Sequence, residues 1–279
     1  MFKSLKYKLD PDLFELWVDR VNLQLAKHIT FADRAVALSD TGIDRYPTPE
    51  IFFQLIQQFD QVLSWFGTAN IDFVQSVKKV HKQVKFLPFL PDRPNQHLTD
   101  FRRMQLETIF GELSNYKTIP EVCWSTDDHW YAKEFLGHSQ DESRVAIHPG
   151  ASGLQKQWPI NNFSDLAITL ANDRKQKSFL VQGPLDNNPI SMLSFSLERA
   201  GISFQKIQVK SLSQLAAILI HCQLYVGNDS GITHLAAFLG VPTVAIFIST
   251  NPLIWCPRGS HVTVLKRPTV EQVLSSIPY

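Results

Sequence analysis

The C-terminal half of this chain alternates short apolar strands with helix-like stretches, and this alternation constrains the fold more than any other feature. The predicted strands cover residues 143–150, 177–184, 223–231 and 242–250. Helix-like stretches of about ten residues separate them, which is enough to cross from one parallel strand to the next. Strands connected in this way form right-handed βαβ units covered by helices on both faces, so the sequence predicts an α/β fold with parallel sheets.

The N-terminal half shows the same alternation less regularly. Residues 11–28 are predicted to form an amphipathic helix, because apolar residues recur there at helical spacing and Asp10 with Pro11 suits a helix start. The elements predicted after it are a strand at 34–40, a helix at 48–59, a strand at 60–67, a helix at 71–83, a strand at 84–91 and a helix at 97–111. Since a single core rarely grows beyond about 250 residues, the chain of 279 residues predicts two domains, 1–140 and 141–279.

The charge balance excludes a general attraction to nucleic acid or to an anionic membrane. Lys and Arg number 27 and Asp and Glu 26, so the formal net charge is +1 and any phosphate site must be local. The cysteines and histidines have no metal-ligand spacing, and neither a metal nor a cofactor is predicted. Without a signal-like start or an apolar run of roughly 18 residues, the sequence predicts a cytoplasmic protein.

The stretch GNDSGITH, residues 227–234, places Asp229 and Ser230 between a predicted strand and a predicted helix. The first amides of a helix lack partners within the helix, and the helix dipole favours negative charge there, so this junction suits a phosphate or diphosphate. Gly231 lets an anion approach the backbone closely. The competing interpretation is helix capping by Asp229, which needs no ligand. His234 taken alone is more often a packed residue than a catalytic one.

A second turn of small residues follows the strand at 143–150. The stretch HPGASGLQKQWP, residues 148–159, contains Ser152 in a flexible loop and Lys156 where its ammonium group can reach a phosphate. Taken singly, Lys156 is an ordinary solvated surface residue. Neither turn is a GxGxxG or P-loop fingerprint, which argues against those nucleotide sites. Ligands of parallel sheets lie beyond the carboxyl ends of the strands, so two such turns together favour an anion-binding site.

These motifs together resemble the C-terminal half of the family 9 glycosyltransferases, the lipopolysaccharide heptosyltransferase family. The resemblance rests on VAIHPGASGLQKQWPINNF, FLVQGP, LAAILIHCQLYVGNDSGITHLAAFLGVPTVAIF and NPLIWCPRG, within about residues 143–260. FDQVLSWFG and HLTDFRRMQLETIFG extend it weakly into the N-terminal half. Each motif is weak alone, but the combination is specific. The resemblance implies a GT-B-like architecture of two Rossmann-like domains facing a cleft, here with an incomplete N-terminal domain on the acceptor side.

The resemblance also implies a function. Family members transfer a sugar from a nucleotide-diphosphate donor, typically ADP-heptose, to a lipopolysaccharide-type or other glycan acceptor, with inversion and without an essential metal. A lipid-linked acceptor would bring the protein to the inner face of a membrane as a peripheral contact. The acidic residue that binds the ribose in the family matches Asp186, which is shorter than the usual Glu. The donor-binding residues implied by position are Ser152, Lys156, Asp186, Asp229, Ser230, Gly231 and His234.

The chain departs from the family at its N-terminus. Family members open with a strand and an R-x-x-x-x-G-D turn, whose aspartate is taken as the base that deprotonates the acceptor, whereas this chain opens with the predicted helix at 11–28. Asp40 and Asp44 follow a predicted strand and are the candidates for that base, with a polar turn as the competing interpretation. A second departure is Ile248, where the family has glycine, which predicts a differently shaped loop because isoleucine disfavours positive φ.

Two rival functions stay open at this point. A truncated or non-catalytic relative would bind a nucleotide without transferring a sugar, since the usual base motif is missing. A nucleotide-sugar epimerase or hydrolase shares the two-domain architecture, and it would form free sugar or an isomer from the donor without any acceptor.

Overall fold

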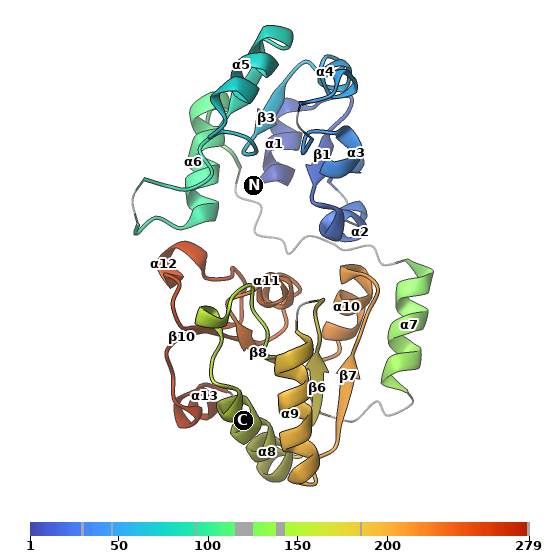
Figure 1. The fold of residues 1–279 in the computed structure, drawn as a ribbon, viewed down its shortest axis with the longest axis vertical. Helices are drawn as coiled ribbons and strands as arrows, with labels where there is room; N and C mark the ends of the chain where they lie inside the picture. Colours follow the sequence, from blue (N-terminus) through green and yellow to red (C-terminus); the bar gives the residue numbers. More distant parts are fainter. Residues whose placement is uncertain are drawn as a thin grey trace. The chain divides into compact units, whose positions relative to one another are not determined.

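The computed structural model describes residues 1–28, 31–45, 47–92, 94–114, 125–137, 143–184 and 186–277. The contacts within the chain divide it into two compact units, Met1–Cys123 and Trp124–Tyr279. Each unit combines parallel strands with helices, as Figure 1 shows.

The second unit is built on one six-stranded parallel sheet. Its strands are β5 (Arg144–His148), β6 (Lys177–Val181), β7 (Phe204–Ile207), β8 (Leu224–Asn228), β9 (Thr243–Phe247) and β10 (Val262–Lys266). They lie in the order β10-β9-β8-β5-β6-β7. This is the strand order of a Rossmann domain, in which the winding reverses between β5 and β8. The predicted α/β class with parallel sheets is therefore confirmed.

Helices cover both faces of this sheet. The helices of the unit are α7 (Thr126–Leu136), α8 (Ile160–Arg174), α9 (Asn187–Arg199), α10 (Leu212–Leu219), α11 (Gly231–Phe238), α12 (Pro252–Trp255) and α13 (Val270–Ser276), with a 3-10 turn η2 (Leu154–Lys156). On one face, Val145 and Ile147 of β5 lie in a buried cluster with Phe163 of α8 and Leu193 of α9. Helix α11 contacts β8 and β9 and packs beside α10. Because side chains alternate along a strand, His148 points to the face opposite Ile147.

The first unit contains two small parallel sheets, β1 with β2 and β3 with β4, within its described part. Its strands are β1 (Glu15–Val18), β2 (Arg34–Ala37), β3 (Val62–Ser64) and β4 (Val84–Phe86). Its helices are α1 (Phe2–Leu9), η1 (Arg20–Asn22), α2 (Leu23–Lys27), α3 (Leu38–Thr41), α4 (Glu50–Ile56), α5 (Ile71–Val80) and α6 (Leu98–Phe110). One core cluster joins Phe52 and Ile56 to Val77 and Val84.

The predicted helix at 11–28 is wrong. Asp10 adopts the left-handed backbone region, with φ 44°, and ends α1 instead of starting a helix. Glu15–Val18 forms β1, which pairs in parallel with β2. Trp17 of this strand packs edge-on against Phe52 and Phe59, with ring centroids 6.1 and 6.2 Å apart. Tertiary packing thus overrides the helical spacing, and β2 is the second strand of the unit instead of the first.

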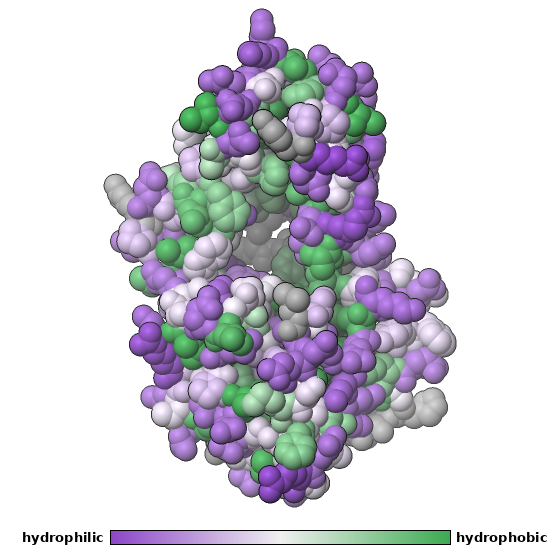
Figure 2. Space-filling model, viewed as in Figure 1, coloured by the Kyte–Doolittle hydropathy of each residue, from purple (hydrophilic) through white to green (hydrophobic). Residues whose placement is uncertain are grey.

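The boundary between the units lies before the predicted one at residue 140. Helix α7 packs against α10 of the second unit. The hydroxyl of Tyr131 on α7 donates to the Gln208 carbonyl at 3.1 Å, and Gln205 Nε2 donates to the Phe135 carbonyl at 3.0 Å. These contacts place α7 in the second unit. Hydrophilic residues predominate on the face drawn in Figure 2, with apolar residues interspersed among them.

Candidate functional site

The two loops predicted at 148–159 and 227–234 meet at the carboxyl edge of the six-stranded sheet, where the strand order reverses. Asn228, which is fully buried, ties them together. Its side-chain nitrogen donates to the Pro149 carbonyl at 2.8 Å, and its side-chain oxygen accepts from the Trp158 amide at 2.8 Å. A buried amide with both ends paired holds its neighbours firmly, because breaking either bond would leave a buried polar group unpaired.

Helix α11 begins at this edge with an open first turn. Ser230 is its N-cap, and the Ser230 hydroxyl oxygen accepts from the Thr233 amide. The competing interpretation of Asp229 as the cap is therefore wrong. A Cβ placed on Gly231 would meet no atom within 4 Å. The start of α11 thus has room beside its unpaired amides, which favour an anion.

The Asp229 carboxylate faces the loop after β5. Its Oδ2 accepts from Lys156 Nζ at 3.2 Å and from the Thr250 hydroxyl at 2.7 Å. The Asp229 side chain is 7% exposed and that of Lys156 is 26% exposed. The buried carboxylate therefore holds the ammonium group at the sheet edge while leaving it accessible to an incoming anion.

Thr250, His148 and Asn228 also belong to this site, although no motif in the sequence singled them out. A signal for each was present, since all three lie at or just after the carboxyl ends of β5, β8 and β9. Their hydrogen bonds to Asp229, to Ser230 and to the loop after β5 join strands that are distant in the sequence. Local spacing carries no information about such contacts.

Beneath the start of α11, two buried titratable side chains meet. Asp186 Oδ2 lies 2.8 Å from His148 Nε2 and accepts from the Gly183 amide at 2.8 Å. Both side chains are less than a tenth exposed. A Cβ on Gly150 would lie 1.9 Å from a carboxylate oxygen of Asp186, and one on Gly183 would lie 2.6 Å from the other. The structure thus brings Asp186 to the predicted edge, but its carboxylate points inward to His148.

We expect Asp186 to make the stability of the second unit depend on pH in the acid range. Burial raises the pKa of its carboxyl, but the hydrogen bond and charge of His148 and the Gly183 amide together outweigh burial, so the pKa lies below its ordinary value. Such a group stabilises the fold fully above its unfolded pKa, about 3.9. That contribution is lost as the pH falls through the lower folded value.

Chemical denaturation of the natural chain and of Asp186→Asn between about pH 6 and pH 3 checks this expectation. The difference in free energy of unfolding between the two proteins should be largest near pH 6 and should shrink below about pH 4. A difference that stays constant over the whole range would contradict it.

The remaining predicted site residues lie at the same edge or in the first unit. Ser152 is exposed in the loop before η2, and His234 is exposed on the first turn of α11. In the first unit, Asp40 lies in α3 and forms an ion pair with Arg20. Asp44 is exposed in the turn that follows α3.

The backbone at Ile248, just after β9, does not require glycine. The non-glycine residues with positive φ in the described part of the chain are Asp10, Lys175 and Arg267. Ile248 instead packs against the core cluster under α8 and α9. The loop after β9 therefore accommodates isoleucine without backbone strain.

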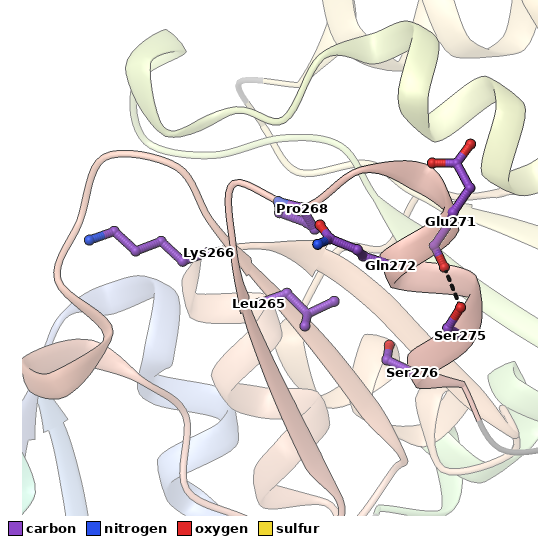
Figure 3. A pocket seen from close by; sticks show the side chains of 7 residues that line it. All are labelled: Leu265, Lys266, Pro268, Glu271, Gln272, Ser275 and Ser276. Atoms are coloured by element: carbon purple, nitrogen blue, oxygen red, sulfur yellow. Dashed lines mark hydrogen bonds between the residues drawn. The ribbon is translucent and has the colours of Figure 1, made fainter.

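A surface groove of about 490 Å³ lies between β10 and α13 at the edge of the sheet. Figure 3 shows that Lys266 and Glu271, which line it, point in different directions. Their charged groups therefore do not act together on a ligand. Across the described ranges, no cluster of three or more His, Cys, Asp or Glu side chains is arranged to hold a metal ion. No helix within those ranges is long and apolar enough to span a membrane.

Several known proteins with related sequences are named as heptosyltransferases. Lipopolysaccharide core heptosyltransferase OpsX of Haemophilus influenzae is 25% identical over 141 residues, which are 50% of this chain and 40% of that protein. The heptosyltransferase II structure from Escherichia coli superposes with a TM-score of 0.73 at 16% identity, covering 98% of this chain and 92% of that one. A family 9 glycosyltransferase structure from Veillonella parvula gives 0.78 at 16% identity, covering 98% and 89%. At these identities the structural similarity shows the fold.

The match to a known family profile is longer than the sequence match to OpsX. The chain aligns with about two fifths of the length of the curated relatives, 40% for OpsX and 36% for a heptosyltransferase 3 of Escherichia coli. Residues 96–273 match the profile described as glycosyltransferase family 9 (heptosyltransferase). That match spans more than half of the 279 residues, and the protein therefore belongs to glycosyltransferase family 9, the heptosyltransferase family.

Proposed function

We propose that this protein is a glycosyltransferase that binds a nucleotide-diphosphate sugar at the carboxyl edge of the sheet in its second unit. The observation that carries the proposal is the meeting of the Lys156 ammonium group with the open start of α11, across the Asp229 carboxylate. An ammonium group and unpaired helix amides are the groups that bind a diphosphate in proteins. The relatives named above support a heptose-like sugar and ADP, since the Escherichia coli structure is that of an ADP-heptose heptosyltransferase.

In the proposed complex, the diphosphate lies between Lys156 and the first turn of α11. Gly231 leaves space there, and Ser152 lies exposed in the facing loop. The free oxygen of the Asp229 carboxylate and the exposed His234 are suited to sugar hydroxyl groups. A direct contact of Asp186 with the ribose would require its carboxylate to leave His148.

The proposed reaction is an inverting transfer without a metal. An acceptor hydroxyl oxygen attacks the anomeric carbon from the side opposite the diphosphate, and the bond from that carbon to the diphosphate oxygen breaks. Lys156 and the α11 amides stabilise the negative charge that develops on the departing diphosphate. The acceptor proton passes to a carboxylate base.

Asp44 is the better of the two candidates for that base. The Asp40 carboxylate is engaged by the Arg20 guanidinium, so its oxygens are less available to an acceptor hydroxyl. Asp44 is exposed on the turn after α3, and within the described residues no ion pair holds it. We therefore assign the base role to Asp44.

The acceptor that we propose is a lipopolysaccharide-type or other glycan, since the relatives are named as lipopolysaccharide heptosyltransferases. We place the protein in the cytoplasm, with at most a peripheral contact at the inner membrane face. Nucleic acid is not a proposed partner, because the net charge of +1 offers no general attraction to it.

Calorimetric titration tests the donor site directly. The full chain is titrated with ADP, UDP and GDP, first in EDTA and then in magnesium, beside an Asp229→Ala variant. Binding of one nucleotide that persists in EDTA and is lost in the variant would support a donor site that needs no metal. Absence of binding to all three would overturn the proposal.

The second candidate function is nucleotide binding without sugar transfer. It is favoured by the donor-side groups lying together in the second unit, since Lys156 and the start of α11 could bind a nucleotide without any base acting on an acceptor. Incubating the binding-competent protein with a nucleotide sugar and a glycan acceptor separates the two, since only the transferase forms a glycoside. Free sugar or an isomer formed from the donor alone would instead indicate a hydrolase or an epimerase.

Thr250 should contribute to donor binding through Asp229. In Thr250→Val the hydrogen bond to Asp229 Oδ2 is lost, so the carboxylate holds Lys156 less firmly and the donor Kd should rise by about tenfold. Thr250→Ser keeps the hydroxyl and should restore binding to within about twofold of the natural chain. Equal affinity of the valine and serine variants would show that this hydrogen bond has no part in binding.

A further inference from the structure

A continuous set of polar side chains connects the buried Asp186 to the start of α11. His148 Nε2 lies 2.8 Å from Asp186 Oδ2, and His148 Nδ1 lies 3.2 Å from the Ser230 hydroxyl oxygen. Ser230 in turn lies 3.1 Å from the Thr233 hydroxyl, which also contacts the Tyr225 hydroxyl at 3.0 Å. His148 and Asp186 lie in the interior, whereas Ser230 is partly exposed at the proposed diphosphate site.

The hydrogen positions in this set follow from which groups can donate. The Thr233 hydroxyl donates to the Asn228 carbonyl, which can only accept, so the Tyr225 hydroxyl donates to Thr233. The pKa of Asp186 is lowered, so near neutral pH its carboxylate also only accepts, and His148 Nε2 carries a hydrogen.

The protonation state of the other ring nitrogen, His148 Nδ1, determines whether the Ser230 hydroxyl can donate to a ligand. In neutral imidazole, His148 Nδ1 is an acceptor and competes for the single Ser230 proton. In imidazolium, Nδ1 is a donor, so Ser230 accepts from it and its own proton is released from that contact, which leaves the Thr233 hydroxyl oxygen as its acceptor within the protein, at 3.1 Å. The Ser230 proton can then be donated to an oxygen of an anion beside the start of α11.

We propose that His148 and Asp186 are positioning residues of the donor site, which couple binding of a diphosphate at Ser230 to the uptake of one proton by His148. The inference rests on the proposed function and adds a proton to the binding step. The proton comes from the buffer, binds His148 Nδ1, and leaves the covalent structure of the donor unchanged.

The groups around His148 can stabilise the added proton. Asp186, at the start of α9, supplies a carboxylate at hydrogen-bond distance that compensates the charge of a buried imidazolium. Tyr225 on β8 stays neutral because burial raises its pKa. Within the described loops at this edge, Lys156 and Asp229 form an ion pair with each other, and His234 is a further titratable side chain, exposed on the first turn of α11. A bound diphosphate adds negative charge on the Ser230 side, and this also favours imidazolium.

The test is calorimetric titration of the full chain with ADP-glucose, whose diphosphate diester binds no proton near neutral pH. Each titration is run in MOPS and in imidazole buffer at several values between about pH 5.5 and pH 8, the range in which imidazole titrates. A difference in binding enthalpy between the buffers measures the protons taken up. The natural chain should show uptake that increases from the acid end of the range, and its affinity should fall by up to about tenfold per pH unit.

Variants separate a positioning role from a merely structural one. His148→Asn keeps an amide that can contact Ser230 but cannot titrate, so proton uptake should disappear and the Kd near pH 6 should rise as it does in Asp186→Asn. Asp186→Asn removes the compensating charge, so uptake should disappear and the Kd near pH 6 should rise by about tenfold. As a matched control, His81→Asn changes a buried histidine of the first unit, whose Nε2 lies 2.7 Å from the Phe59 carbonyl, and it should leave the uptake unchanged.

Binding by the natural chain with equal enthalpy in both buffers would overturn the coupling while leaving the donor site intact. Uptake that persists in His148→Asn would overturn it as well, because the proton would then go elsewhere. Absence of binding of both ADP and ADP-glucose by the natural chain would overturn the coupling, and the donor site would be overturned with it if UDP and GDP also fail to bind.

Discussion

Lys156→Met should weaken binding of the nucleotide-diphosphate donor by roughly tenfold to a hundredfold. Lys156 supplies the ammonium group at the sheet edge, and a hydrogen bond to a charged group contributes about 1.5–3 kcal/mol, which corresponds to that change in Kd. Methionine keeps the apolar stem of the side chain, so packing of the loop is retained. The Asp229 carboxylate keeps its hydrogen bond from Thr250, so the fold should persist. Calorimetric titration with ADP measures the effect.

The matched control for this variant is Lys206→Met. Lys206 is an exposed residue of β7, an edge strand of the same sheet, and it stacks over the Phe204 ring. The two variants change the net charge equally, so a general electrostatic effect would appear in both. Donor affinity that falls equally in both variants, or in neither, would contradict the assignment of Lys156.

Gly150→Ala should lower the free energy of unfolding of the second unit by about 3 kcal/mol or more. The added Cβ would lie 1.9 Å from the Asp186 carboxylate, so the carboxylate must move away from His148 and the Gly183 amide. Gly150 does not adopt a positive φ, so the cost comes from this contact alone. Thermal unfolding should show a Tm lower by about 6–12 °C.

Gly231→Ala is the control for the glycine substitution. Its added Cβ would meet no atom within 4 Å, so its Tm should stay within about 2 °C of that of the natural chain. The same methyl group lies where the diphosphate is proposed to approach α11, so donor binding should weaken without a loss of stability. A Gly150→Ala protein as stable as Gly231→Ala would show that the Asp186 carboxylate adjusts without cost.

Much of the second unit could be predicted from the sequence because its elements are set by local signals. β5, β6, β8 and β9 are short apolar runs, and each is followed by a turn or a helix start. Ser211 caps α10 through its side chain, and the spacing of Ser211 and Gln214 is a local signal of such a cap. The first unit was less predictable, since the pattern at 11–28 satisfies helical spacing while its central residues pair with β2.

The candidate site also combines features that the sequence predicts with features that it does not predict. The sequence by itself determined that Lys156, Asp229, Ser230 and Gly231 lie in loops after parallel strands, because strand and turn signals are local. Only the tertiary structure decided that Asp229 holds Lys156 and Thr250 and leaves the capping to Ser230. It alone decided that Asp186 turns inward to His148. The physical reason is that these partners lie on different strands, and the direction of a buried carboxylate depends on which donors the packed sheet brings within reach.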